Sequence, residues 1–363
     1  MKASNHRKYG FGIIGTGAIA SFHAKAIEAI TDARLIAVQS QTYRQAKEFA
    51  EQNDCEAYET IEELLLREDI NIVSICTPSG VHAEPALKSI AAGKHCLIEK
   101  PIEVTLERSD EIIEAAKLKG VLLAVVFPSR FYEGSQTLKK ALDTGQFGKV
   151  ALASAYVKWS RTADYYNSAK WRGTWQLDGG GALMNQAIHA VDMLQWCMGP
   201  VESVMAFKNN IKHTEIEVED TLVAALKFAN GAVGSIECST AVYPGTLKKL
   251  EIMGTRGTAI MEDNNLVKWE FDSECEQVQN INLSNPRALT GGASNPLSIS
   301  QLGHQKQIEN LIQAIAGREK LLVDGQEARK SVEIVLAIYR SAENGNVVHL
   351  PLKTQPQSHK SEL

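Results

Sequence analysis

The sequence contains no long apolar run, and its charges nearly balance. No stretch approaches the roughly 20 consecutive apolar residues that a membrane-spanning helix needs, so we expect no membrane partner. The formal net charge is −5 over 363 residues, and such a chain lacks the basic surface that attracts nucleic acid. We therefore expect neither nucleic acid nor a lipid surface among the partners.

Cysteine is scarce, and the spacing of the cysteines fits neither a metal site nor a redox motif. Three of them, Cys76, Cys96 and Cys238, lie in apolar, strand-like runs, so we expect buried free thiols. The first residues, Met1–Lys8, are polar and basic and show no secretory signal. We expect a cytoplasmic protein in a reducing compartment. The six cysteines are Cys55, Cys76, Cys96, Cys197, Cys238 and Cys275.

A glycine motif follows the first apolar run. Phe11–Ile14 leads into Gly15-Thr16-Gly17-Ala18-Ile19-Ala20, and a helical pattern comes next. In a strand–turn–helix unit, the first glycine permits the tight turn, the second admits a diphosphate, and the third small residue allows close packing. The free N–H groups of the helix then hold the anion. A plain glycine turn is the alternative, but the position between a strand and a helix favours a dinucleotide site.

The first third of the chain alternates short apolar runs with helical patterns. Runs that are apolar on both faces are typical of buried parallel strands, and their alternation with helices predicts a doubly wound Rossmann sheet over residues 1–126. The predicted strands are Phe11–Ile14, Arg34–Val38, Ile72–Cys76, His95–Glu99 and Leu122–Val126, and the predicted helices are Arg44–Gln52, Ile61–Arg67, Val81–Ala92 and Leu106–Leu118.

After Phe127 the pattern changes to strands of period two. We predict a second α+β domain over residues 127–351, with a large, mainly antiparallel open sheet for substrate binding and oligomerisation, and a tail over 352–363. The helix at 326–341 is expected to pack back on the first domain. Asn230-Gly231 predicts a hairpin turn, and Cys275–Ile299 reads as a loop. The predicted strands are Ala151–Lys158, Thr221–Phe228, Ala232–Ser239, Leu247–Met253, Thr258–Glu262 and Leu266–Glu270; the predicted helices are Glu133–Asp143, Ala182–Cys197, His304–Ala316 and Gln326–Ser341.

Glu99-Lys100-Pro101 follows a buried strand, at the edge where this sheet type binds its ligands. A partly desolvated lysine there can donate to a developing alkoxide. The proline directs the backbone, and a cis peptide is possible there. A surface lysine at a strand-to-loop junction is an equally good interpretation from position alone.

A second cluster runs from Asp178 through Gly179-Gly180-Gly181 to Asp192. Asn185 and His189 stand four residues apart and share a helical face, where a neutral histidine could accept a hydroxyl proton. Asn185 could only orient the substrate or the imidazole, and Asp192 could brace His189 or make a structural hydrogen bond. A core histidine is the alternative interpretation. We expect no metal site, because no second ligand stands at suitable spacing from His189.

Three segments of the chain together resemble the Gfo/Idh/MocA oxidoreductase family. They are Gly15-x-Gly17-x-x-Ala20, Thr77-Pro78-Ser79-Gly80-Val81-His82-Ala83-Glu84, and Ala92-Gly93-Lys94-His95-Cys96-Leu97-Ile98-Glu99-Lys100-Pro101. The Gly179–Asp192 segment is similar to the family's glycine-rich approach to its catalytic histidine. The likeness covers about Tyr9 to Pro351.

The resemblance implies NAD(P)-dependent chemistry on sugars or cyclitols, with an open C-terminal sheet that is often buried in dimers or tetramers. It implies that Lys100 contacts the nicotinamide region and the substrate hydroxyl, and that His189 is the acid/base. We expect a homodimer or homotetramer that forms through this sheet. The predicted cofactor contacts are Gly15, Gly17, Ala18, Ile19, Ser40, Arg44, Thr77, Pro78, His82, Glu99, Lys100 and Pro101.

Two departures from the family pattern matter. Many members carry aspartate where this chain has Asn185, so a carboxylate relay from that position is in doubt. The second predicted strand is followed by Gln39-Ser40-Gln41 rather than by an acidic residue, and Arg44 could reach a 2′-phosphate, although a solvated charge is equally plausible. We expect NADP or NAD as cofactor, with NADP slightly favoured.

An aromatic and basic run precedes the second cluster, and such faces suit a polyol or sugar. A surface loop with packed aromatics is the bland alternative. Arg130 and His304 are weaker pocket candidates. The run consists of Lys158, Arg161, Tyr165, Tyr166, Trp171, Arg172 and Trp175; the predicted substrate contacts are Lys100, Arg130, Tyr156, Trp171, Arg172, Asn185 and His189.

These patterns predict an oxidoreductase that interconverts a secondary alcohol and a ketone on a sugar, sugar derivative or cyclitol. The predicted catalytic residues are Lys100, His189 and Asn185. Two alternatives remain open: a tightly bound cofactor that oxidises transiently in a glycosidase- or lyase-type reaction, and a non-catalytic regulator that senses the cofactor.

Overall fold

The computed structural model describes residues 9–272 and 301–352. The predicted loop at Cys275–Ile299, Cys275 itself, the polar start Met1–Lys8 and the tail from residue 353 lie outside the described residues. None of the described helices is both long and apolar enough to cross a membrane. Cys76, Cys96 and Cys238 are buried free thiols, as the sequence predicted.

A six-stranded parallel sheet forms the first layer, as predicted, with the strand order β3-β2-β1-β4-β5-β6. This order reverses direction between β1 and β4, which is the point where doubly wound sheets bind dinucleotides. The predicted strands are confirmed within two residues, but β3 was not predicted, because three half-exposed residues show no periodicity. The bounds are β1 Tyr9–Ile14, β2 Ala33–Gln39, β3 Glu56–Tyr58, β4 Ile72–Ile75, β5 His95–Ile98 and β6 Leu123–Val125.

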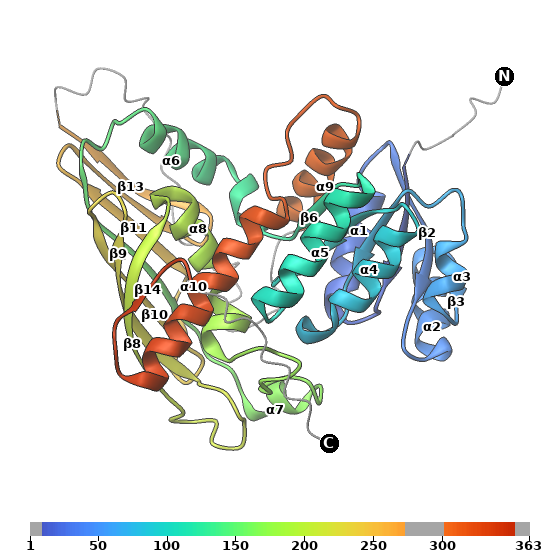
Figure 1. Ribbon diagram of the computed structural model, residues 1–363, viewed down its shortest axis with the longest axis horizontal. Coiled ribbons are helices and arrows are strands. Elements are labelled where there is room, and N and C mark those ends of the chain that lie inside the picture. The colour runs from blue at the N-terminus through green and yellow to red at the C-terminus, as the bar shows by residue number, and fades with distance from the viewer. Residues whose placement is uncertain (1–8, 273–300, 353–363) are drawn as a thin grey trace.

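Helices cover both faces of this sheet (Figure 1). Their ends follow local capping chemistry. Thr60 and Glu63 form a reciprocal capping box at the start of α3, and the side chain of Thr105 accepts from the backbone N–H of Arg108 at the start of α5. Gly120 ends α5 in the left-handed region. The bounds are α1 Ala18–Glu28, α2 Tyr43–Asn53, α3 Ile61–Leu65, η1 Ser79–Val81, α4 Ala83–Ala91 and α5 Leu106–Lys119.

The second layer is an eight-stranded sheet with the order β13-β12-β11-β7-β10-β9-β8-β14, in which only β7 and β10 pair in parallel among the described strands. The predicted antiparallel character is therefore confirmed. Alternation sets its two faces: Leu222, Ala224, Leu226 and Phe228 of β9 are buried. Strands β8 and β14 were not predicted. The bounds are β7 Val150–Lys158, β8 Val201–Asn209, β9 Thr221–Phe228, β10 Val233–Ser239, β11 Lys249–Gly254, β12 Gly257–Glu262, β13 Asn265–Phe271 and β14 Val348–His349.

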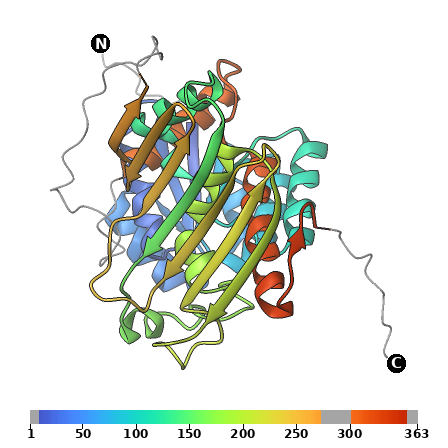
Figure 2. The same ribbon diagram turned by 90° about the vertical axis from the view of Figure 1, so that its left-hand side faces the viewer.

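Helices cover only one face of this second sheet. Figure 2 shows the other face toward the viewer, with no described helix in front of it. Exposed apolar side chains lie there, among them Phe207 at 71% exposure and Val223, which pair across β8 and β9. The helices between the sheets and along them are η2 Pro128–Phe131, α6 Glu133–Asp143, α7 Ala163–Asn167, η3 Ala182–Ala187, α8 Ile188–Met198, α9 Leu302–Ile315 and α10 Gly325–Asn344.

The last two helices link the layers. Helix α9 packs on α1 and buries Ile308 and Leu311 in the core of the first sheet. Helix α10 packs against α8 and β8 and also against α5, where Arg329 forms an ion pair with Asp110. Figure 1 shows α10 running between the two sheets.

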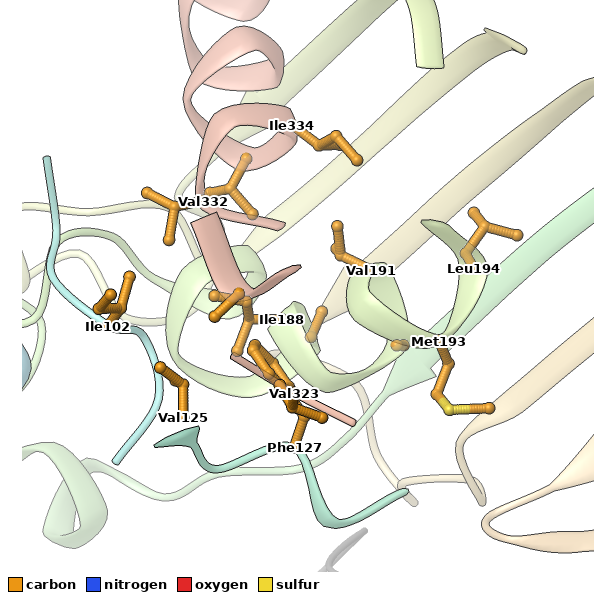
Figure 3. Close-up of a cluster of buried hydrophobic side chains, with 14 of the residues drawn as sticks. Ile102, Val125, Phe127, Ile188, Val191, Met193, Leu194, Val323, Val332 and Ile334 are labelled. Carbon is orange, nitrogen blue, oxygen red and sulfur yellow. The ribbon is translucent and has the colours of Figure 1, made fainter. Parts of the chain in front are cut away.

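One apolar core therefore runs through both layers. Figure 3 shows Ile102, Val125 and Phe127 from the first sheet and the segments that follow its strands, packed with Ile188 and Val191 of α8. Because the residue after Ile188 is His189, this packing fixes where the predicted catalytic histidine stands relative to the carboxyl ends of β5 and β6.

Candidate active site

The glycine turn lies at the carboxyl end of β1, against the end of β4. Gly15 has φ +97°, and a Cβ there would stand 2.7 Å from the carbonyl oxygen of Cys76, so only glycine fits. Gly17 caps α1 without a side-chain hydrogen bond, no acidic residue stands in the first turn, and a Cβ at Gly17 would meet open space. An uncapped, exposed helix start with free backbone N–H groups fits a diphosphate. Ala18 and Ile19 form this first turn.

Two hydroxyls replace the usual acidic residue beyond β2. The Oγ1 of Thr16 lies 2.8 Å from the Oγ of Ser40, which links the glycine turn to the end of β2. Arg44, in the first turn of α2, has 85% of its side chain exposed and lies 3.6 Å from Glu48. Arg44 is therefore a surface side chain, four positions after Ser40 in the chain.

His82 ties together the loops that follow β4 and β5. Its Nδ1 lies 2.8 Å from the carbonyl oxygen of Pro101 and its Nε2 lies 3.0 Å from that of Thr77. Burial lowers the pKa of this imidazole. Both ring nitrogens lie against backbone carbonyls, so His82 positions the loops that carry Thr77 and Pro101. A direct cofactor contact of His82 stays a prediction.

Glu99 is buried, and its carboxylate is held from both sides. His23 of α1 donates to Oε1 at 2.8 Å, and Nε2 of His304 lies 3.8 Å from the same oxygen. Ser74 donates to the other nitrogen of His23 at 2.6 Å. Burial opposes the charge, but the two imidazoles outweigh it and hold the pKa of Glu99 well below its usual range.

This triad was not foreseen, although the sequence analysis named Glu99 and His304 separately. One side-chain nitrogen or oxygen from each of His23, Glu99 and His304 lies within 4.8 Å of the other two. Groups at this spacing could also hold a metal ion. The backbone N–H of Lys100 donates to the other carboxylate oxygen of Glu99 at 3.1 Å. The triad therefore fixes the backbone from which the Lys100 side chain starts, and a direct cofactor contact of Glu99 stays a prediction.

Lys100 reaches across to the second domain. Its Nζ donates to the backbone carbonyl of Asn185 at 2.7 Å, and the peptide bond to Pro101 is cis. Burial lowers the pKa of the ammonium, while Glu99 and Asp178 oppose that shift. The hydrogen bond uses one of the three protons of the ammonium group and leaves two for a ligand.

The segment that carries Asn185 is a π-helical turn, η3, followed by α8. The predicted helical segment at Ala182–Cys197 is confirmed, but its first part is π-helical rather than α-helical. Glu219 accepts backbone N–H bonds from Gly181 at 3.1 Å and Leu183 at 2.9 Å, and a Cβ at Gly181 would lie 1.7 Å from the Glu219 carbonyl oxygen. Close backbone approach explains this glycine, and π-helical turns often mark functional sites.

Asn185 is oriented by a network of polar side chains. Its Nδ2 donates to Asp178, whose other oxygen accepts the N–H of Gly173 at 2.9 Å. Tyr165 donates to Oδ1 of Asn185 at 3.2 Å and accepts from Arg172 at 2.6 Å. Burial raises the pKa of Asp178 to about 6. The role of Asp178 was missed, because its only signal in the sequence is its place before three glycines.

His189 points its ring into the same region as Lys100. Burial, and then the Lys100 ammonium, lower its pKa well below the usual value, so the imidazole is neutral at physiological pH. Its ring packs edge-on against Phe127 with centroids 5.6 Å apart. The Nδ1 is buried without a hydrogen-bond partner among the described residues. Since His189 is partly exposed, Nε2 is the nitrogen that a ligand can reach.

The structure selects the structural interpretation of Asp192 and places two predicted substrate contacts, Arg130 and Tyr156, in other surroundings. Asp192 does not brace His189, because both of its oxygens bind Arg130, at 2.9 and 2.7 Å. Arg130 is fully buried and also pairs with Glu327, so it is a core ion pair rather than a substrate contact. Tyr156 lies on the open face of the second sheet, beside Glu251, whereas its neighbours Ala155 and Val157 face the helices.

The family comparison agrees with this geometry. Residues 9–127 match the family model for "Oxidoreductase family, NAD-binding Rossmann fold", and residues 135–260 match the GFO/IDH/MocA C-terminal domain. The Myo-inositol 2-dehydrogenase of Thermotoga maritima is 30% identical, over 70% of this chain and 75% of that protein. The D-glucoside 3-dehydrogenase of Escherichia coli is 26% identical, over 93% of this chain and 96% of that protein.

A solved structure extends the likeness to nearly the whole chain. The WlbA dehydrogenase from Bordetella pertussis, in complex with NADH and UDP-GlcNAcA, is 32% identical with a TM-score of 0.83, over 95% of this chain and all of that one. Fold, glycine turn and these relatives define an NAD-dependent oxidoreductase with a Rossmann domain. The chain belongs to the Gfo/Idh/MocA oxidoreductase family.

Proposed function

We propose that this protein interconverts a secondary alcohol and a ketone on a sugar, a sugar derivative or a cyclitol. The observation that carries the proposal is the convergence of Lys100 and His189 from different domains: Lys100 bonds the carbonyl of Asn185, and its charge acts on the buried imidazole of His189. Relatives named as dehydrogenases of inositol and of glucosides support the substrate class. Gly15, Gly17 and the start of α1 would hold the dinucleotide, which supplies a hydride acceptor when bound.

Lys100 stabilises the substrate oxygen. Its ammonium has two free protons after bonding the Asn185 carbonyl, and one of them would donate to the hydroxyl whose carbon is oxidised. A positive charge in a partly desolvated site stabilises the negative charge that develops on this oxygen. Lys100 does not need to lose its own proton for this role.

His189 accepts the hydroxyl proton at Nε2. A neutral imidazole is the form that can accept, and burial together with Lys100 keeps the ring in that form. Asn185 cannot titrate, so it orients the substrate, and Asp178 and Tyr165 fix the direction of its amide.

The dinucleotide preference is part of the proposal. No acidic side chain directly follows β2 to pair with the adenosine ribose hydroxyls, and Arg44 is exposed in the first turn of α2. We propose that the enzyme uses both NAD and NADP, with NADP slightly favoured. The NADH complex of the WlbA dehydrogenase supports use of the unphosphorylated form.

Self-association through the open sheet face is also proposed. The exposed Leu152, Phe207, Val223 and Val233 lie on the face that no described helix covers, and such a patch typically marks an interaction surface. Light scattering of the purified chain tests this proposal, and a Phe207→Glu variant is expected to dissociate a dimer or tetramer.

The reaction is tested by following absorbance of the reduced nicotinamide while NAD or NADP is mixed with a panel of sugars and inositols. Net cofactor reduction by at least one member supports the proposal. Conversion of a sugar without net reduction points instead to transient oxidation. Cofactor binding without turnover on any member contradicts the enzymatic proposal.

A further inference from the structure

Arg172 stands at the site with its guanidinium stacked on two aromatic rings. Its central carbon lies 4.4 Å from the ring centroid of Tyr165 and 4.7 Å from that of Trp171. Its Nη1 donates to the Tyr165 hydroxyl at 2.6 Å, and this hydroxyl in turn donates to Asn185. The plane of the guanidinium is therefore fixed beside the backbone segment that binds Lys100.

The remaining edge of this guanidinium has no acceptor. Within residues 9–272 and 301–352, Arg172 forms no ion pair, its Nε is buried without a hydrogen-bond partner, and Nη2 has none either. Burial raises the pKa of Asp178, and Arg172 is near enough to oppose that rise, but the two oxygens of Asp178 bind Asn185 and Gly173. Arg172 is half-buried, and a guanidinium that is partly removed from water is normally paired with carboxylate or phosphate; the described chain supplies neither to its Nε and Nη2.

Positive charge exceeds negative charge in this part of the described structure. Three cationic side chains, Lys100, Arg161 and Arg172, belong to the hydrogen-bond network around Asn185, and two carboxylates, Asp178 and Glu99, oppose them. His189 is neutral. Arg172 lowers the pKa of Lys100, so the two cations act on the same region. An anionic group near both would stabilise each of them.

We propose that the substrate is a sugar that carries a carboxylate, and that Arg172 binds this carboxylate through its Nε and Nη2 edge. The planar fork of a guanidinium matches the two oxygens of a carboxylate. This inference rests on the proposed function, because it names the substrate class of the same site. Trp171 and Tyr165 hold the fork rigid, and the carboxylate lies to one side of the hydroxyl that Lys100 and His189 act on.

Matched substrate pairs test the inference on the purified full-length chain. Glucuronate is compared with glucose, and UDP-glucuronate with UDP-glucose, while glucose 6-phosphate separates phosphate from carboxylate. A carboxylate that completes a charged hydrogen-bonded pair is expected to raise kcat/KM about 100-fold over the neutral partner.

Variants of Arg172 test whether this residue causes the preference for the carboxylated sugar. Arg172→Gln is expected to raise KM for the preferred uronate about 100-fold more than it raises KM for the neutral partner, because only the uronate loses the charged pair. Arg172→Lys keeps the charge but loses the fork, and it should recover only part of the affinity. Arg108→Gln, on the surface of α5, is the control and should change neither value.

Three kinetic outcomes contradict the inference, and a binding measurement decides the case in which no sugar is oxidised. Equal kcat/KM on neutral and acidic sugars would show that Arg172 binds no substrate carboxylate. An equal loss of kcat/KM on both sugars in Arg172→Gln would show the same. A preference for glucose 6-phosphate assigns the site to phosphate. If no sugar is oxidised, the proposed function fails, and calorimetry with glucuronate in the presence of NAD tests the inference separately. Glucuronate binding that is lost in Arg172→Gln supports a carboxylate site at Arg172. If glucuronate does not bind, the inference is overturned.

Discussion

Lys100 and Asn185 stand 85 positions apart in the chain, and the Nζ of the first lies 2.7 Å from the backbone carbonyl of the second. The hydrogen bond joins the end of β5 in the first sheet to the π-helical turn η3 beneath the second. The site is therefore complete only where the two domains pack together, and the apolar contacts of Ile102 and Phe127 with Ile188 hold them in that position (Figure 3).

Removal of either proposed catalytic group should stop the chemistry and spare cofactor binding. We expect Lys100→Ala and His189→Ala each to lower kcat by about 100-fold or more, because one stabilises the oxygen and the other moves its proton. Affinity for NAD, measured by fluorescence titration, should change less than about threefold. Lys117→Ala and His349→Ala, at exposed positions, serve as controls, and near-normal turnover in either site variant refutes its role.

The acid limb of the pH profile should belong to Asp178. Burial raises its pKa to about 6, whereas that of His189 is held well below its usual value. Above about pH 6, Asp178 is ionised, accepts a hydrogen bond from the Asn185 amide and stabilises the charge of Lys100. Below about pH 6, the carboxyl is protonated and this charge stabilisation is lost. We expect kcat/KM to fall as the pH drops through about 6, and Asp178→Asn to remove this limb while lowering activity at neutral pH. A limb that persists in Asp178→Asn assigns it to another group.

Glu219 should make stability depend on pH. Burial raises the pKa of this carboxyl from 4.5 to about 7, so between these values the folded state keeps a proton that the unfolded state releases. The free energy of unfolding should therefore fall by about 3 kcal/mol as the pH rises through this window. Urea titrations at several pH values measure it. Glu219→Gln should flatten the dependence, the exposed Glu215→Gln should not, and a flat wild-type profile contradicts the assignment.

Arg130 should matter for stability and not for the substrate. Arg130→Ala leaves Asp192 as an unpaired buried carboxylate, and such changes cost about 3–5 kcal/mol. The double variant Arg130→Met with Asp192→Leu should recover most of that loss. Arg108→Ala, which breaks an exposed pair with Glu111, should cost less than about 1 kcal/mol. A large rise in KM in a stably folded Arg130 variant would restore its predicted substrate role.

The residue after β2 should set the dinucleotide preference. Ser40→Asp adds the carboxylate that pairs with ribose hydroxyls and repels a 2′-phosphate, so we expect the ratio of kcat/KM for NAD over NADP to rise about 100-fold. Arg44→Ala should lower kcat/KM with NADP alone. A strong preference of the wild-type enzyme for NAD, unchanged in Arg44→Ala, overturns the proposal of dual use.

Local patterns predicted most of the elements but not their irregularities. Helix α6 at Glu133–Asp143 and strand β9 at Thr221–Phe228 have the bounds that periodicity predicted. The apolar pattern of Ala182–Ala187 predicts helix but does not distinguish a π-helical from an α-helical turn. The backbone N–H groups at the start of this turn bond to Glu219, more than thirty positions further on in the chain. Strand β14 and edge strand β3 are too short to show a period.

The sequence by itself determined the doubly wound first sheet, the antiparallel second sheet and the segments that hold Lys100 and His189, since apolar periodicity, glycine turns and short motifs are local properties. Only the tertiary structure decided which polar groups face each other. It paired Asp192 with Arg130, turned Tyr156 to the open sheet face, set His23 and His304 against Glu99, and left Arg172 without a carboxylate. Those outcomes depend on burial and on contacts between segments far apart in the chain, where desolvation makes each buried charge find a partner that no local pattern specifies.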